Sequence, residues 1–167
     1  LAAFWEHENL NVRLAATHAI VDRGDAQARD LAAAMLDSTS ASPDGRVHAM
    51  WVVERMGGVA PAQLEGLLGD DARELRIHAL KLLAERPVWE SGAFNWGPAV
   101  RAMTADHGPF VRWAAADALG RHPAQENLQP LLDLWQATDS DDTHLVHVTR
   151  MALRDQLLVP GMYEAAA

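Results

Sequence analysis

The chain has 167 residues, 49% of them hydrophobic and 22% charged, which is enough to bury a core and ordinary for a folded protein. Against 14 Lys and Arg stand 23 Asp and Glu, and the resulting net charge of −9 argues against a nucleic-acid partner. The absence of Cys excludes disulfides, thiolate zinc sites, thiol catalysis and covalently attached haem, and no apolar run is long enough for direct membrane insertion.

A helical pattern recurs five times along the chain. In each copy, apolar residues stand at a first position and again 4, 7 and 8 residues later, offsets that place them on one helical face. The copies begin at Val12, Gly45, Leu75, Val111 and Leu145, which are 33, 30, 36 and 34 residues apart. Gly45 and, in the last copy, Thr149 depart from the apolar pattern. We therefore predict an internal repeat whose helices bury this face.

Other helices are predicted between these copies. Residues 1–5 resemble half a hairpin, and residues 26–36, 61–68, 98–105 and 126–137 complete the set. Each unit is thus a helical hairpin, joined to the next by turns rich in Gly, Pro, Asp and Asn. Residues 86–98 form a longer connection, which we interpret as an insertion that Trp89 and Trp96 fix onto the array.

Two columns of charged residues keep the same phase as the repeat. The position after the first carries Arg13, Arg46, Arg76 and Arg112, and Asp44, Asp71, Asp106 and Asp142 lie near the helix starts. An Asp at a helix start accepts hydrogen bonds from free backbone N–H groups, so we predict helix caps. The Arg column is expected to reach the Asp or the carbonyls of a neighbouring repeat and to hold the array together.

The segment VRWAAADALG at residues 111–120 resembles the HEAT repeat, with variants beginning at Val12, Arg46 and Arg76. The resemblance covers nearly the whole chain. It implies an all-α fold, a right-handed superhelix (solenoid) of about four to five helical hairpins forming one array over residues 1–167. HEAT arrays serve as scaffolds, so it also implies a non-catalytic module that binds a protein partner or other domains of its own parent chain.

Three segments carry a finer resemblance: RVHAMWVVERMGG, LRIHALKLLAERP and DDTHLVHVTRMALRDQL. They are similar to the HEAT segment of large bacterial multidomain proteins, which resemble membrane-associated, exported dehydrogenases with a separate haem-binding module. That HEAT segment has no known catalytic residues, and C-x-x-C-H is absent here, so we expect no cofactor. The chain begins at Leu1 and ends in EAAA, which we interpret as a fragment of a longer protein. The resemblance implies an exported or periplasmic location; without it the cytoplasm is expected.

The second helix of each hairpin lines the inner side of a HEAT array. Positions 3, 6 and 10 residues after the first of each copy should form an exposed stripe there. The binding residues predicted on this stripe are His18, His48, Trp51, Arg55, His78, Lys81, Asp117 and Arg121. Trp51 is the strongest candidate, because Trp is enriched at binding hot spots, although packing against a neighbouring repeat would explain it equally well. Trp113 and Trp135 are expected in the core.

His18, His48 and His78 stand thirty residues apart, which raises the question of a metal site. Only His48 and His78 share a repeat position, and a zinc site needs three or four converging ligands. We interpret these histidines as polar side chains at a permissive position and predict no metal. His144 and His147 are three residues apart and suit a metal only weakly, and the acidic segment at 139–142 lacks the Gly and closing Glu of a calcium loop.

An enzyme is the alternative. Some HEAT-like folds resemble alkylpurine DNA glycosylases, and others resemble bilin lyases. The glycosylase type needs a basic channel with aromatic residues and a carboxylate; aromatic residues and Asp117 are present, but the basic charge is not. The bilin-lyase interpretation depends on the repeat type alone. The sequence has no nucleophile-elbow, phosphate-loop, dinucleotide-binding or H-E-x-x-H motif, and we predict no catalytic residue.

Overall fold

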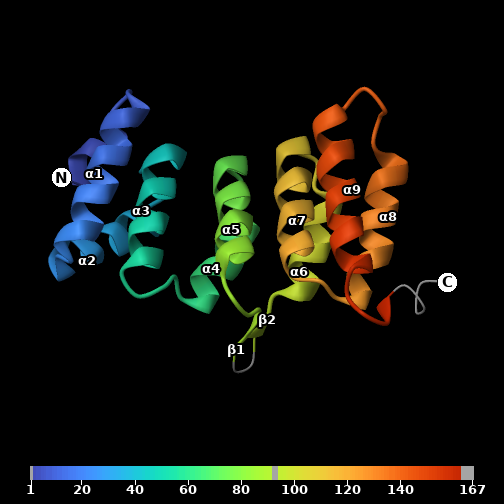
Figure 1. Ribbon diagram of the computed structural model, residues 1–167. Helices are drawn as coiled ribbons and strands as arrows, with labels where there is room; N and C mark the ends of the chain where they lie inside the picture. The colour runs from blue at the N-terminus through green and yellow to red at the C-terminus, as the bar shows by residue number, and fades with distance from the viewer. Residues whose placement is uncertain (1, 92–93, 163–167) are drawn as a thin grey trace. The chain divides into compact units, whose positions relative to one another are not determined.

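A computed structural model describes residues 2–91 and 94–162 of the chain. They form an all-α fold of repeated helical hairpins, as the sequence predicts (Figure 1). The chain divides into two compact units, of which the first ends at His78 and the second begins at Ala79. Helix α5 (Arg73–Glu85) therefore contributes its first half to one unit and its second half to the other. We call the second helix of each hairpin its inner helix; these are α1, α3, α5, α7 and α9.

The first unit contains η1 (Ala2–Glu6), α1 (Leu10–Arg23), α2 (Ala26–Leu36), α3 (Pro43–Arg55), α4 (Pro61–Leu68) and the start of α5. Helices α1 and α3 pack side by side, and α2 packs against α3 (Figure 1). Local sequence sets the boundaries of these helices. The side chain of Asn9 caps α1, Asp25 caps α2 and Ser42 caps α3. Gly24, with φ of 62°, ends α1 in the left-handed conformation that favours glycine.

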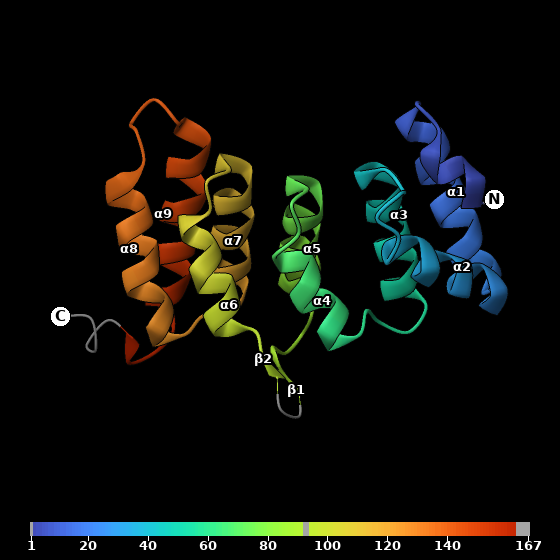
Figure 2. The same cartoon turned by 180° about the vertical axis from the view of Figure 1, so that it is seen from behind.

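The second unit contains the end of α5, β1 (Glu90–Ser91), β2 (Phe94–Asn95), α6 (Gly97–Ala102), η2 (Met103–Ala105), α7 (Pro109–Arg121), η3 (Gln125–Asn127), α8 (Leu128–Ala137) and α9 (Thr143–Leu157). Helix α6 packs on α7 and α8 packs on α9; α6 lies in front of α7 in Figure 2. The helices predicted at residues 98–105 and 126–137 each combine an α-helix with one 3₁₀ turn.

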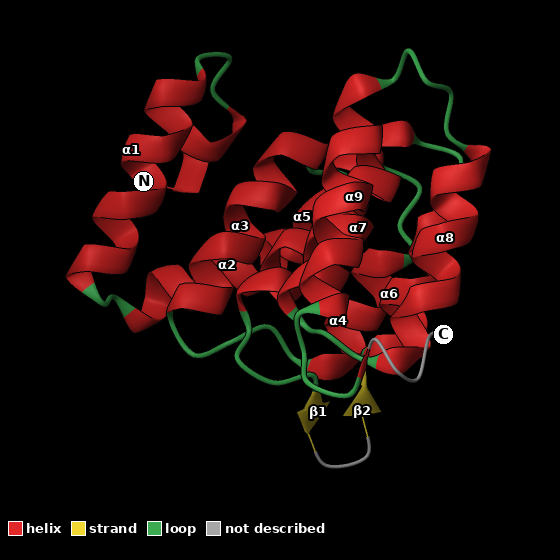
Figure 3. Ribbon diagram, turned by 45° about the vertical axis from the view of Figure 1, so that its right-hand side comes forward, coloured by secondary structure: helices red, strands yellow, loops and turns green. Residues whose placement is uncertain are grey.

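The predicted insertion at residues 86–98 contains two short antiparallel strands, which are the only strands in the described ranges (Figure 3). Trp89 and Trp96 are both buried, and the Trp89 indole Nε1 donates to the Leu83 carbonyl at 2.9 Å. The backbone N–H of Trp96 donates to the Trp89 carbonyl at 3.3 Å. The prediction that these tryptophans fix the insertion onto the array is confirmed.

The predicted core columns are buried except at Val12 and Ala19. Both lie in α1, where η1, a single turn of 3₁₀ helix, stands in place of a full outer helix. The structure also explains why Gly45 stands in an apolar column. A Cβ atom at Gly45 would overlap the Glu6 carboxylate, whose Oε1 accepts from the Ser42 backbone N–H at 3.1 Å.

Two tryptophans differ from their predicted core positions. Trp113 is half-buried, and Trp135 is 42% exposed. Leu131 and Leu134 occupy the buried face of α8, and Trp135 follows Leu134 by one residue, about 100° further round the helix. Its ring therefore points outward, where the Arg150 guanidinium carbon lies 5.7 Å from the ring centroid.

The first two arginines of the column have the predicted role of joining neighbouring repeats. Arg13 pairs with Asp44 at 2.9 Å and Arg46 pairs with Asp70 at 2.8 Å, and each ion pair joins one repeat to the next. Three of the arginines repeat a second interaction, in which Nη1 donates to two carbonyls of the loop before the arginine's own helix. These are Arg13 to His7 and Glu8, Arg76 to Asp70 and Asp71, and Arg112 to Asp106 and His107.

The Asp column caps its helices less regularly than predicted. Asp142 caps its helix as predicted, accepting from the Leu145 backbone N–H at 3.1 Å. Ser42 caps α3 instead of Asp44, whose carboxylate pairs with Arg13. Asp106 accepts from Gly108 N within the loop before α7, and Gly108 is the N-cap residue of that helix.

Candidate binding surface on the inner helices

Two of the three positions of the predicted exposed stripe are accessible in the structure, and the third is mostly buried. Side chains 6 and 10 residues after the first position of each copy are half-buried or exposed, as predicted: His18, Arg55 and Arg121 are exposed, and Trp51, Lys81 and Asp117 are half-buried. The position 3 residues after the first is different. His48 is 6% exposed, Ala114 and Val148 are buried, and His78 is half-buried. The prediction that His48 is exposed is therefore wrong.

Helical geometry explains the burial of His48. At about 100° per residue, the position 3 residues after the first lies only about 60° from the first position and 40° from the one 7 residues after it. It therefore lies at the edge of the core, facing the neighbouring inner helix, whereas the position 6 residues after the first lies on the opposite side. His48 faces α1, where Arg13 and Thr17 are its hydrogen-bond partners.

Burial and Arg13 set the protonation of His48. Burial lowers the pKa of His48, the nearby Arg13 guanidinium lowers it further, and Asp44 opposes both effects. His48 is therefore a neutral link between α1 and α3 near pH 7. Because it is buried, His48 is not available for contact with a binding partner.

Trp51, Arg55 and His78 form a cluster in the first unit, which we call the Trp51 cluster. The Trp51 indole Nε1 donates to Nδ1 of His78 at 2.9 Å, and the two rings meet edge to face with centroids 6.2 Å apart. The Arg55 guanidinium carbon lies 5.2 Å from the Trp51 ring centroid, within the range of a cation–π interaction. The indole is thus held by one hydrogen bond and one stacked cation while remaining half-buried.

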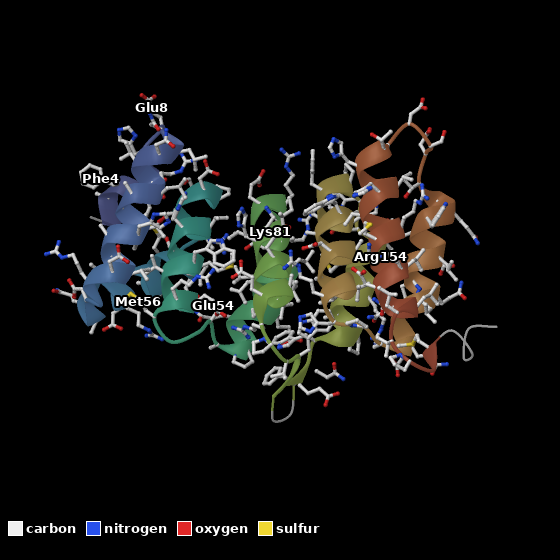
Figure 4. The ribbon with its side chains drawn as sticks, viewed as in Figure 1. Phe4, Glu8, Glu54, Met56, Lys81 and Arg154 are labelled. Atoms are coloured by element: carbon white, nitrogen blue, oxygen red, sulfur yellow. The ribbon has the colours of Figure 1, made fainter. Side chains whose placement is uncertain are left out.

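The predicted residues of the second unit are spread along its inner helices. Lys81 is half-buried on α5, and Asp117 and Arg121 form an ion pair of 3.1 Å, one turn apart on α7. Figure 4 labels Lys81 on α5 and Arg154 on α9; the Arg154 guanidinium pairs with Asp155 at 2.6 Å. Because Asp117 pairs with Arg121, its carboxylate is engaged by a cation of its own helix.

Several polar side chains with structural roles were not singled out from the sequence. Gln156 is fully buried; its Oε1 accepts from Ala124 N at 2.8 Å, and its Nε2 donates to the Leu119 carbonyl at 2.9 Å. Asn127, also fully buried, donates to Gln156 Oε1 at 3.1 Å. These residues attach the loop after α7 to α9. The signal available in the sequence was the polar residue Gln156 close to the buried column of α9.

The described residues offer no metal centre. Within residues 2–91 and 94–162, no group of three or more His, Asp or Glu side chains could hold a metal ion. A cavity of about 480 Å³ lies at the start of α1 and α3 in the first unit, and one of about 600 Å³ lies beside α8 in the second. Neither is lined by a predicted binding residue. No helix in the described part of the chain combines the length and apolar character needed to cross a membrane.

Comparison with known proteins identifies the repeat. A family model of HEAT repeats matches residues 60–148. The matched part begins before α4 and ends within α9, so it includes the Arg76 and Arg112 positions of the repeat column. No match was found among curated proteins or among solved structures.

Proposed function

Because this chain belongs to the HEAT-repeat family, we propose that it is a non-catalytic binding module that holds a protein partner, or another domain of its parent chain, on its inner helices. HEAT repeats generally act as scaffolds for protein interaction. The proposal assigns a surface and no catalytic residue.

The observation that supports this surface best is the Trp51 cluster. Tryptophan and arginine are the side chains most enriched at binding hot spots, and a contact residue held in place before binding loses less conformational entropy on association. Trp51 is held in this way, by His78 at its indole nitrogen and by Arg55 at its ring face. It also remains half-buried and not fully covered, so part of its surface is open to a partner.

Two forms of the proposal differ in where the partner comes from. In the first, the partner is a separate protein. In the second, it is a neighbouring domain of a longer chain, such as the multidomain, haem-binding, dehydrogenase-like proteins that the sequence resembles, and the module would then be exported with its parent. The two forms share the inner surface and differ in what cross-links to it.

The experiment uses the single lysine of the sequence. Lys81 lies on inner helix α5, so an amine-reactive cross-linker reports on the inner side, apart from the N-terminal amine. The chain is used as bait in extract of its source, and cross-linked peptides are identified by mass spectrometry. Cross-links from Lys81 to a separate protein support the first form, and cross-links to flanking parts of its own parent support the second. If Lys81 cross-links to nothing while the N-terminal amine does, the inner surface is excluded.

A further inference from the structure

His48 joins the first two inner helices through hydrogen bonds that only one form of the imidazole satisfies. Its Nε2 lies 3.3 Å from Arg13 Nε, and its Nδ1 lies 3.0 Å from Thr17 Oγ1. The Thr17 hydroxyl donates a hydrogen bond to the Arg13 carbonyl at 3.0 Å. Its oxygen is therefore the acceptor in the contact with Nδ1 of His48. Arg13 Nε always carries hydrogen, so Nε2 must accept. The geometry selects the neutral imidazole with its proton on Nδ1.

A second proton on His48 finds no acceptor among the two hydrogen-bond partners of its ring, Arg13 and Thr17. It would reside on Nε2 and face the N–H of Arg13 at 3.3 Å, so that two donors and two positive charges oppose each other. His48 is 6% exposed, and water therefore screens this repulsion poorly. Protonation thus requires that either His48 or Arg13 leave its place.

Arg13 contacts several groups of the first two hairpins at once. Its Nη1 donates to the carbonyls of His7 and Glu8 at 2.7 and 3.1 Å, and its Nη2 pairs with Asp44 at 2.9 Å. One guanidinium therefore holds the loop before α1, the helix α3 and the His48 ring together. Displacement of Arg13 from His48 loosens all of these attachments.

Two charged groups act directly on His48: Arg13 from α1, and Asp44 from the first turn of α3 itself. Four other charged groups of the elements packed around α3 in this unit have partners elsewhere. These are Glu6 of η1 with Ser42 N, Arg29 of α2 with the Met56 carbonyl, Asp37 after α2 with Gln63, and Glu74 of α5 with Arg73. Figure 4 labels Met56 and Glu54 near the end of α3, away from Glu8 at the start of α1.

We propose that His48 is an acid-sensitive latch: uptake of a proton at Nε2 breaks the hydrogen bond from Arg13 and releases α1 from α3. Repeat arrays are held by nearest-neighbour contacts, so one hairpin can open while the remaining repeats stay folded. The inference goes beyond the proposed binding function, since it concerns how the first hairpin is held and not what the array binds.

The first test needs no variant. Nitrogen-15 NMR of the imidazole rings in the full chain is expected to show His48 as the neutral Nδ1–H tautomer at pH 7.5. Amide hydrogen exchange of α1, corrected for the intrinsic pH dependence, is expected to rise as the pH falls below 6.5, the ordinary pKa of histidine, by up to about tenfold per pH unit. Exchange of α9 amides should not follow this trend.

The second test uses His48→Gln, whose side-chain amide oxygen can accept from Arg13 and does not titrate in this range. Its α1 exchange is expected to lose the acid dependence. His18→Gln, which replaces an exposed histidine of α1 itself, is the matched control and should keep the acid dependence. The proposal is overturned if α1 exchange in the unmodified chain is independent of pH, if His48 is already charged at pH 7.5, or if His48→Gln keeps the full acid dependence.

Discussion

The indole Nε1 of Trp51 donates a hydrogen bond of 2.9 Å to Nδ1 of His78, and this bond joins inner helices α3 and α5. His78 stands at the repeat position that His48 occupies one copy earlier, and His48 accepts from Arg13 of α1. The two histidines thus have one role, as acceptors from the preceding inner helix. For His48 and His78, the thirty-residue spacing therefore reflects hydrogen bonds between successive inner helices, whereas His18 is exposed and stands at a different repeat position.

Trp51→Phe keeps an aromatic ring but removes the N–H donor, so we expect it to lower the free energy of unfolding by about 0.5–1.5 kcal/mol. Urea unfolding followed by circular dichroism measures the change. Trp135→Phe is the control, because no hydrogen bond of its indole is seen and its ring is 42% exposed. Equal effects of the two substitutions would mean that the Trp51–His78 bond contributes nothing to stability.

His122 gives the second unit its own pH dependence. Its ring stacks on Trp89 with centroids 4.2 Å apart, and its Nε2 contacts the Leu83 carbonyl at 3.2 Å. Burial lowers the pKa of His122 below the ordinary value of 6.5, opposed by the carbonyls of Leu83 and Ala84. The folded state therefore binds the proton less readily than the unfolded state does.

The stability contributed by neutral His122 is consequently present above pH 6.5 and declines as the pH falls from there toward the lowered pKa. We expect the urea concentration at the unfolding midpoint of the unmodified chain to decrease as the pH is lowered from 7.5 to 5. For His122→Gln the decrease should be smaller. Gln retains an N–H that can donate to the Leu83 carbonyl. An unchanged slope in His122→Gln would contradict the assignment.

Gln156→Leu is expected to destabilise the second unit by about 2–4 kcal/mol, because it removes several hydrogen bonds from a buried network. The Ala124 N–H, the Leu119 carbonyl and the Asn127 amide all lose a bond. Gln129→Leu, on the exposed side of α8, is the control and should cost much less, since only its bond to Asp133 is lost. Chemical denaturation of both variants measures the difference.

Two helical glycines should respond oppositely to alanine. A Cβ at Gly66 in α4 meets nothing within 4 Å, so Gly66→Ala is expected to stabilise by about 0.5–1 kcal/mol through helix propensity. A Cβ at Gly120 in α7 would lie 3.2 Å from the backbone Cα of Ala152 in α9, and backbone gives way poorly. Gly120→Ala should therefore destabilise, as thermal unfolding of both variants will show. A gain in stability at Gly120 would mean that the α7–α9 contact is looser than the structure indicates.

The repeat could be predicted from the sequence because burial of a helical residue depends on which face of the helix it occupies. Offsets of 4, 7 and 8 residues placed the core columns correctly except at Val12 and Ala19, and Gly45 and Thr149 are buried although they break the apolar pattern. The length of the connection at residues 86–98 likewise indicated an insertion, and its two tryptophans, Trp89 and Trp96, are buried as predicted.

The candidate site was less predictable, because the side of a helix that faces its neighbour is set by how helices pack and not by periodicity alone. His48 and His18 were both assigned to an exposed stripe, yet His48 is covered by α1 and His18 remains exposed. The prediction for Trp135 was wrong in the opposite direction. Its neighbours in α8 are apolar and it was expected in the core, but its ring lies at the surface against Arg150. The hydrogen-bond partners of His48 and the partner of Trp51 come from a neighbouring repeat, so the sequence of one helix does not reveal them.

The most direct test of the binding surface compares two tryptophans that each carry a stacked arginine. Trp51 lies on inner helix α3 beneath Arg55, and Trp135 lies on outer helix α8 beside Arg150. Affinity for the partner or parent domain captured through Lys81 is measured by calorimetry for Trp51→Ala and Trp135→Ala, after circular dichroism has shown both to be folded. The proposed surface predicts a loss of about 30-fold or more for Trp51→Ala and almost none for Trp135→Ala. Unchanged affinity in Trp51→Ala, or an equal loss in both, would contradict it.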